Sequence, residues 1–135
     1  MILGLGIDLV QIDAFGAQLD DAASHFTRAT FTEGEVAYAR SAPSGEPARH
    51  LAARYAAKEA AVKALDLACA RAGIDAPRLS LNAIEVVCDE RGRPRLELYG
   101  AAAELATRLG ADRTWVSLSH DGPSAVATVL MERLA

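Results

Sequence analysis

The chain has 135 residues, of which 51% are hydrophobic, 24% charged and 5% aromatic. These proportions are typical of a globular protein with an alanine-rich interior, and the length is that of one domain with one core, residues 1–135. The formal net charge of −4 excludes a general nucleic-acid binder, because such a protein needs a basic face. Any anionic ligand must therefore be held by a local cluster of basic residues.

Neither a signal peptide nor a membrane helix is indicated. Residues 1–10 are apolar but carry Asp8 and no basic leader, and this apolar run is too short to span a bilayer. Cys69 and Cys88 stand apart, without the Cys-x-x-Cys spacing of a zinc or redox site, so free thiols in a reducing compartment are expected. The sequence therefore predicts a cytoplasmic protein with no membrane contact.

The first predicted element is a strand at residues 2–10. Alternation places four apolar side chains on one face, which we expect to pack against the core: Leu3, Leu5, Ile7 and Leu9. The opposite face is bare except for one carboxylate, Asp8, which follows Gly4 and Gly6. Two glycines beside an acid let another backbone or a ligand approach closely. The alternative is that Asp8 only begins a turn.

Short helices are predicted after this strand. The first covers residues 13–23, and residues 24–30 are expected to form a connection. Thr32 has the character of an N-cap, and Glu35 three residues later completes a capping box. A second helix is therefore predicted from Thr32 to about Arg40, and the composition of residues 41–47 indicates a loop.

Residues 49–65 form the centre of the sequence, an alanine-rich stretch without Gly or Pro that predicts a long helix. Its buried stripe is expected to hold the large side chains Leu51, Tyr55, Val62 and Leu65. Three cations and one carboxylate lie at or near the edge of that stripe: Arg54, Lys58, Glu59 and Lys63. Lys58 and Lys63 are the chain's lysines, and ammonium groups suit contacts with phosphate. The ordinary alternative is that Glu59 and Lys63 form a helix-supporting pair.

The second half of the chain mixes strands and helices. Residues 74–80 read as an irregular connection, 84–88 and 94–99 as the strands of a hairpin, 100–110 as a helix, and 115–120 and 125–131 as the last two strands. The predicted order is β-α-α-α-β-β-α-β-β. It favours a single compact α+β domain, with the long central helix packed on an antiparallel-rich sheet.

Polar residues gather again at the end of the strand at 115–120. Alternation puts His120 on one face and Ser119 on the other. Because neighbours on a strand point apart, Ser119, His120 and Asp121 do not form a hydrolase triad by themselves. His120 is either a site residue or an ordinary residue at a turn.

Five short motifs occur in an order and spacing that cover almost the whole chain. They are Gly6-Ile7-Asp8; Phe31-Thr32-x-x-Glu35; Leu51-x-x-Arg54-Tyr55-Ala56-Ala57-Lys58-Glu59-Ala60-x-x-Lys63-Ala64; Gly92-x-Pro94; and Val116-Ser117-Leu118-Ser119-His120-Asp121. Together they resemble the holo-acyl-carrier-protein synthase family, the small 4′-phosphopantetheinyl transferases. The resemblance implies that family's fold, and a homotrimer with its sites between subunits.

The resemblance also implies an activity. The 4′-phosphopantetheine arm of coenzyme A would be transferred to a serine of an apo acyl carrier protein of fatty-acid or polyketide type, leaving adenosine 3′,5′-bisphosphate. A magnesium ion is the implied cofactor. Asp8 and Glu59 are its expected ligands, because Mg²⁺ needs only one or two carboxylates besides waters and substrate phosphates.

The chemistry of further residues fits this implied activity. Lys63, with Lys58 or Arg54, is expected to hold phosphate oxygens. The serine proton is expected to pass to Glu59 through a metal-bound water, and His120 is the alternative acceptor. The nucleotide end of coenzyme A has four candidate contacts: Gly92, Pro94, Ser119 and His120.

Two segments depart from the family's pattern. Residues 10–15 carry an acid and no base where the family presents Arg or Lys to the acidic carrier, so docking moves to Arg28 or Arg40, or the partner is a dedicated, polyketide-type carrier. Residues 66–69 replace a glycine-rich run, so a longer helix and an altered cofactor pocket are expected. Two other functions stay open: a non-catalytic trimeric module that binds carrier or nucleotide, and another Mg-dependent phosphate-ester or anhydride enzyme.

Overall fold

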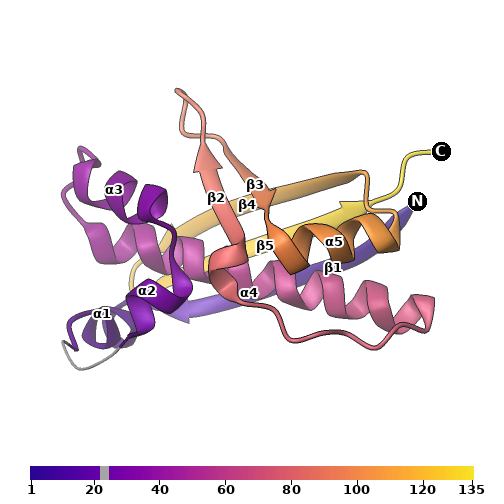
Figure 1. The fold of residues 1–135 in the computed structure, drawn as a ribbon. Coiled ribbons are helices and arrows are strands. Elements are labelled where there is room, and N and C mark those ends of the chain that lie inside the picture. The colour runs from indigo at the N-terminus through magenta and orange to yellow at the C-terminus, as the bar shows by residue number, and fades with distance from the viewer. Residues whose placement is uncertain (22–24) are drawn as a thin grey trace.

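The computed structural model describes residues 1–21 and 25–135. Its elements are β1 (Ile2–Gln11), α1 (Ile12–Leu19), α2 (Phe26–Thr30), α3 (Glu33–Ser41), α4 (Pro47–Ala72), a short 3₁₀ turn (Leu81–Ala83), β2 (Ile84–Cys88), β3 (Pro94–Leu98), α5 (Gly100–Leu109), β4 (Arg113–Asp121) and β5 (Ser124–Glu132) (Figure 1). The predicted α+β class is confirmed, and the strands occur in the predicted order. No helix in the described part of the chain is long and apolar enough to cross a membrane.

The strands form two antiparallel sheets. The larger has the order β1-β5-β4, and the smaller is the β2–β3 hairpin, which projects from the body of the molecule (Figure 1). Both chain ends lie at the same end of the larger sheet, where β1 begins and β5 finishes (Figure 1). The Met1 amino group donates to the Arg133 carbonyl oxygen at 2.7 Å, and the Arg133 N–H donates to the Met1 carbonyl oxygen at 2.8 Å.

Helix α4 runs along one face of the larger sheet (Figure 1). It begins with Pro47, whose fixed φ suits the first helical position, and ends at Gly73, which takes the left-handed conformation at φ 69°. Its buried residues are mostly alanines: Ala52, Ala53, Ala56, Ala57, Ala60, Ala61, Ala64 and Ala68. These small side chains let the sheet approach the helix axis. The helix continues past Leu65 to Ala72, so the expected extension is confirmed.

The two faces of β1 are opposite to the prediction. The glycine face packs against α4, where a Cβ on Gly6 would lie 1.8 Å from the Ala60 carbonyl oxygen and one on Gly4 would lie 2.0 Å from that of Ala64. The predicted core face points outward instead: Leu5 is 53%, Ile7 59% and Leu9 68% exposed. Glycine therefore serves here to bring two backbones together, which was one of the two expectations for these positions.

The short helices differ from the prediction in detail. The segment expected as a connection contains a short helix, α2, which ends at its C-cap residue Phe31. Helix α1 ends at Leu19, and the last residues of the predicted helix at 13–23 lie outside the described residues. The predicted capping box at α3 is confirmed: Thr32 Oγ1 accepts from the Glu35 N–H at 3.2 Å, and Glu35 Oε1 accepts from the Thr32 N–H at 3.0 Å.

The contact between β1 and α4 can be tested with Gly6→Ala. We expect the free energy of unfolding to fall by about 3 kcal/mol or more, the upper end of overpacking costs, because a helix carbonyl oxygen cannot turn aside as a side chain does. Thermal and urea unfolding would measure this loss. Gly16→Ala in α1 is the matched control, since its Cβ would lie an ordinary 3.6 Å from the Ala48 Cβ. Equal stability of the two variants would contradict the packing argument.

Candidate active site

Asp8 and Lys63 meet where β1 crosses α4. Asp8 lies on the helix-facing side of β1, two residues after Gly6. Lys63 Nζ donates to Asp8 Oδ1 at 3.0 Å and to the Ile7 carbonyl oxygen at 2.9 Å. The Asp8 side chain is 19% exposed and that of Lys63 is 55% exposed. Solvent screens this pair, so its effect on stability is small. These two bonds use two of the three donors of the Lys63 ammonium group.

Glu59 lies one helical turn before Lys63 and faces the same region. Glu59 and Asp8 border one open depression of about 400 Å³ between β1, α1 and α4, lined by Asp8, Leu9, Val10, Gln11, Ala14, Phe15, Gln18, Tyr55 and Glu59. The Tyr55 hydroxyl lies beside them: burial raises its pKa, and the nearby Glu59 carboxylate raises it further. Two carboxylates from distant parts of the chain thus share one solvent-open site.

The donor set of this depression suits a hard divalent cation. Mg²⁺ prefers oxygen ligands, keeps several of its waters and commonly takes one or two carboxylates plus substrate phosphates. Asp8 and Glu59 supply that number. Within residues 1–21 and 25–135, no cluster of three or more His, Cys, Asp and Glu side chains is arranged to enclose a metal ion. Two carboxylates would leave the other positions of such an ion to waters or to phosphate oxygens of a substrate.

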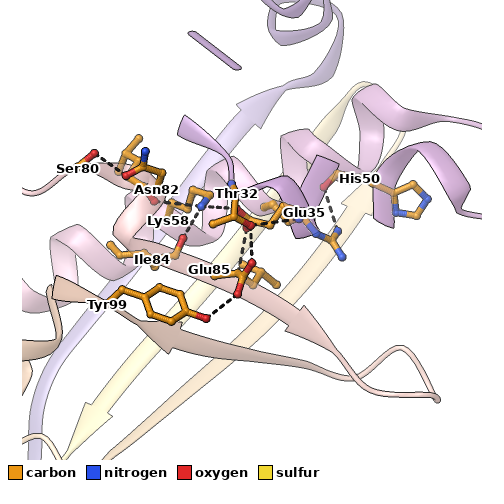
Figure 2. Close-up of polar contacts among 12 residues, drawn as sticks. Thr32, Glu35, His50, Lys58, Ser80, Asn82, Ile84, Glu85 and Tyr99 are labelled. Atoms are coloured by element: carbon orange, nitrogen blue, oxygen red, sulfur yellow. Dashed lines mark hydrogen bonds and ion pairs between the residues drawn. The ribbon is translucent and has the colours of Figure 1, made fainter. Parts of the chain in front are cut away.

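Lys58 does not belong to this site, so the prediction that it holds a phosphate is wrong. Its side chain is fully buried, and its ammonium pairs with Glu35 Oε1 at 2.6 Å. It also donates to the carbonyl oxygens of Leu81, at 3.1 Å, and of Ile84 (Figure 2). Three acceptors use the three donors of an ammonium group. Burial lowers the pKa of Lys58, and the neighbouring Glu35 carboxylate opposes that shift.

Arg54 lies on another side of α4. It is 3% exposed and borders a separate pocket of about 250 Å³ with Tyr38 and Cys88. Its Nη1 donates to the His50 carbonyl oxygen at 3.2 Å, and its guanidinium lies 4.4 Å from the centroid of the Tyr38 ring. Since Arg54 and Glu59 are five residues apart, they project from different sides of the helix. Within one chain, Arg54 is therefore not part of the Asp8 depression.

The remaining predicted residues also lie away from the depression. His120 is at the end of β4 on the helix side of the sheet, where burial, Arg54 and His120 lower the pKa of His50. Ser119 points to the outward face, in register with Val126. Gly92, with φ 76°, and Pro94 belong to the projecting hairpin (Figure 1). None of these four predicted residues lines the Asp8 depression.

The structure gives Glu35 a role beyond the predicted capping box, and it shows a cluster of aromatic rings beside the depression. Glu35 is a buried carboxylate that accepts from Thr32, from Lys58 and, through Oε2 at 3.0 Å, from the Val86 N–H. Four aromatic rings pack beside the depression: Phe15, Phe26, Phe31 and Tyr55. One signal in the sequence could have indicated the role of Glu35: a lysine between Leu51 and Leu65 on a buried stripe requires a buried anion.

Comparisons with known proteins identify the family of this chain. A family model described as the 4′-phosphopantetheinyl transferase superfamily matches residues 4–129. The chain is similar to a holo-[acyl-carrier-protein] synthase of Geobacter sulfurreducens, with 42% identity over 98% of this chain and 99% of that one. Two solved structures extend the likeness. The ACPS–CoA complex of Chronobacterium ammoniagenes has a TM-score of 0.80 and 34% identity, covering 98% of both chains. The holo-(acyl-carrier-protein) synthase of Bacillus anthracis in complex with CoA (3′,5′-ADP) has a TM-score of 0.74 and 30% identity, covering 99% of both.

The structural role of Lys58 can be tested with Lys58→Met. We expect a loss of about 3–5 kcal/mol in the free energy of unfolding, because Glu35 is left as a buried charge without its partner. Adding Glu35→Gln should restore part of that loss, since it removes the stranded charge. Arg95→Met, which breaks the exposed pair with Glu97, is the control and should change unfolding little. A mild effect of Lys58→Met on urea unfolding would contradict this role.

Proposed function

This chain belongs to the 4′-phosphopantetheinyl transferase superfamily, and we propose that it acts as a holo-acyl-carrier-protein synthase, transferring the phosphopantetheine arm of coenzyme A to a serine of an apo acyl carrier protein. The serine oxygen forms a bond to the phosphorus that bears the pantetheine arm, and the bond from that phosphorus to the bridging anhydride oxygen breaks. Adenosine 3′,5′-bisphosphate leaves. The coenzyme A complexes of two relatives support this donor.

One observation carries the proposal: Asp8 and Glu59, from β1 and α4, border the same open depression, and Lys63 is bonded to Asp8. These two carboxylates are the proposed ligands of Mg²⁺. When bound, the ion neutralises charge that develops as the phosphoanhydride breaks. The protein's own contribution is to fix both carboxylates on rigid elements, because phosphoryl transfer depends mainly on positioning and electrostatics.

Lys63 is the proposed phosphate ligand within the chain. Its side chain is 55% exposed, and its ammonium group has a donor beyond the two that bond Asp8 and the Ile7 carbonyl oxygen. An ammonium group binds phosphate oxygens as a compact charge. Anchored at the edge of the depression, Lys63 would hold the diphosphate against Asp8 and Glu59.

Glu59 is the proposed acceptor of the serine proton. It borders the depression next to Tyr55. A general base must be within hydrogen-bond reach of the proton it removes, directly or through one water. His120, the alternative acceptor, is at the end of β4 and does not line the depression of its own chain. The geometry therefore favours Glu59.

We also propose that the chain forms a homotrimer with sites between subunits. The outward face of the larger sheet has an apolar row formed by Leu5, Leu130 and Trp115, and Ile7 and Leu9 continue that face along β1. Contiguous exposed apolar surface of this kind is typical of protein interfaces. Assembly would also explain why Gly92, Pro94, Ser119 and His120 lie away from Asp8, because a neighbouring chain could supply them.

The proposed carrier contact lies at α2 and α3. Helix α1 has an acidic first turn and no basic residue in its last turn. Arg28 and Arg40 instead line a depression of about 630 Å³, whose lining also includes the partly buried Val36 and one acid, Glu33. Basic groups around apolar side chains complement an acidic amphipathic surface. We place the reaction in the cytoplasm, consistent with the two free cysteines.

The metal site can be tested with Asp8→Ala. We expect transfer from coenzyme A to an apo carrier to fall by at least about a hundredfold, since charge stabilisation by a metal at the reacting centre is worth several kcal/mol. The thermal midpoint should change little, because Asp8 makes only a screened surface pair. Mass spectrometry of the carrier measures transfer, and chelation of Mg²⁺ should stop it in the unmodified protein. Full transfer by the variant, or its unfolding, would contradict the assignment.

The assembly can be tested with Leu5→Glu combined with Ile7→Glu. Each carboxylate would be buried against a neighbouring subunit, so we expect the trimer to dissociate into monomers, as measured by light scattering. Leu67→Glu is the matched control, because Leu67 is an exposed leucine on α4, away from the sheet. If the unmodified protein is a monomer, or if the double variant keeps the same mass as the control, the proposed interface is wrong.

A further inference from the structure

Arg54 is a buried guanidinium without a carboxylate partner. Within residues 1–21 and 25–135, no Asp or Glu forms an ion pair with it, and its Nε has no hydrogen-bond partner. The His50 carbonyl oxygen and the Tyr38 ring hold the group in place. Glu85 borders the same pocket, but its oxygens accept from the hydroxyls of Thr32 and Tyr99 (Figure 2). An unpaired buried charge is costly, so this cation favours an anion next to it.

The group that can supply that anion is the Cys88 thiol. Cys88 is the last residue of β2 and lies opposite Pro94 in the hairpin. Its Sγ accepts a hydrogen bond from Arg54 Nη2 at 3.3 Å. The residue is partly exposed and borders the 250 Å³ pocket, which is lined by Gly34, Tyr38, Arg54, Glu85, Val86, Val87 and Cys88. A small molecule therefore has a path to a sulfur atom that a fixed cation contacts.

We propose that Cys88 is a site of reversible thiol–disulfide exchange with small-molecule disulfides, activated by Arg54. The thiolate is the nucleophile in this reaction, and a neighbouring cation stabilises it. The Cys88 sulfur attacks one sulfur of a disulfide R–S–S–R and forms Cys88–S–S–R. The other sulfur leaves as a thiolate and takes a proton from water. The Cys88 sulfur is oxidised, the leaving thiol is reduced, and a free thiol reverses the reaction.

The second cysteine of the chain provides an internal comparison. Cys69 is fully buried in α4 among core residues. Burial raises the pKa of the Cys69 thiol, and the nearby Asp66 carboxylate raises it further. No cation donates to its sulfur among the described hydrogen bonds, and a buried thiol in apolar surroundings is inert. The two thiols should therefore differ strongly in the folded protein.

The test is incubation of the folded chain with glutathione disulfide, followed by mass spectrometry of the intact protein and its peptides. We expect one glutathionyl group on Cys88, formed at least about tenfold faster than on Cys69, and removed by added thiol. Cys88→Ser should abolish the fast adduct, and Cys69→Ser should leave it unchanged. Arg54→Met should slow it severalfold. Equal labelling of the two cysteines, or no adduct on Cys88, would overturn the proposal.

A second measurement does not depend on the folding of a variant. In urea the Arg54 contact is lost, so the reaction of Cys88 should become slower while that of Cys69 becomes faster, until the two rates agree. If the Cys88 reaction instead accelerates on unfolding, the fold protects this thiol rather than activating it, and the proposal is wrong. Both readouts are masses of the protein itself. They need no turnover and are independent of the proposed transferase activity.

Discussion

The structure depends on the direct backbone contact between β1 and α4. A strand and a helix usually meet through side chains, but here the strand has glycine at positions 4 and 6, and the helix presents the carbonyl oxygens of Ala64 and Ala60. Glycine is the residue that allows such an approach, because a Cβ at either position would overlap an oxygen atom. Asp8 follows directly on the same face. The carboxylate proposed to bind the metal is therefore positioned by the same packing that forms the core.

The charged residues of helix α4 have different roles, because they project from different sides of the helix. Lys58 enters the core and is paired with Glu35, whose carboxylate also binds the Thr32 and Val86 N–H groups. This one carboxylate joins α3, α4 and β2. Glu59, the next residue along the helix, faces the depression beside Asp8. A buried ion pair that fixes the scaffold and a solvent-open carboxylate that faces the site are thus neighbours in sequence.

The sequence was sufficient for the order of the strands, the capping box and the hairpin, although it missed α2. The family resemblance grouped Asp8 with Glu59 and Lys63, which lie together in the structure. The sequence failed for the faces of β1, because alternation identifies two faces without saying which one the chain itself covers. Hydrophobicity favoured the leucine face, whereas close packing selected the glycine face. It also misassigned Lys58. A lysine on the buried face of a helix can bind either a ligand or another residue of the protein. Lys58 binds Glu35, which folding brings to it from α3.

Near the two chain ends, Met1 and Arg133 form reciprocal hydrogen bonds, at the end of the larger sheet that lies away from α1 (Figure 1). Ends that lie side by side can be joined by a short peptide without distorting the strands between them. New ends could then be opened at Gly45, in the exposed loop between α3 and α4, where no atom lies close to the backbone on its Cβ side. The fold is therefore suited to circular permutation. In the permuted chain β1 would no longer come first in the sequence, and α4 would precede it, while the spatial arrangement of the two elements would stay the same.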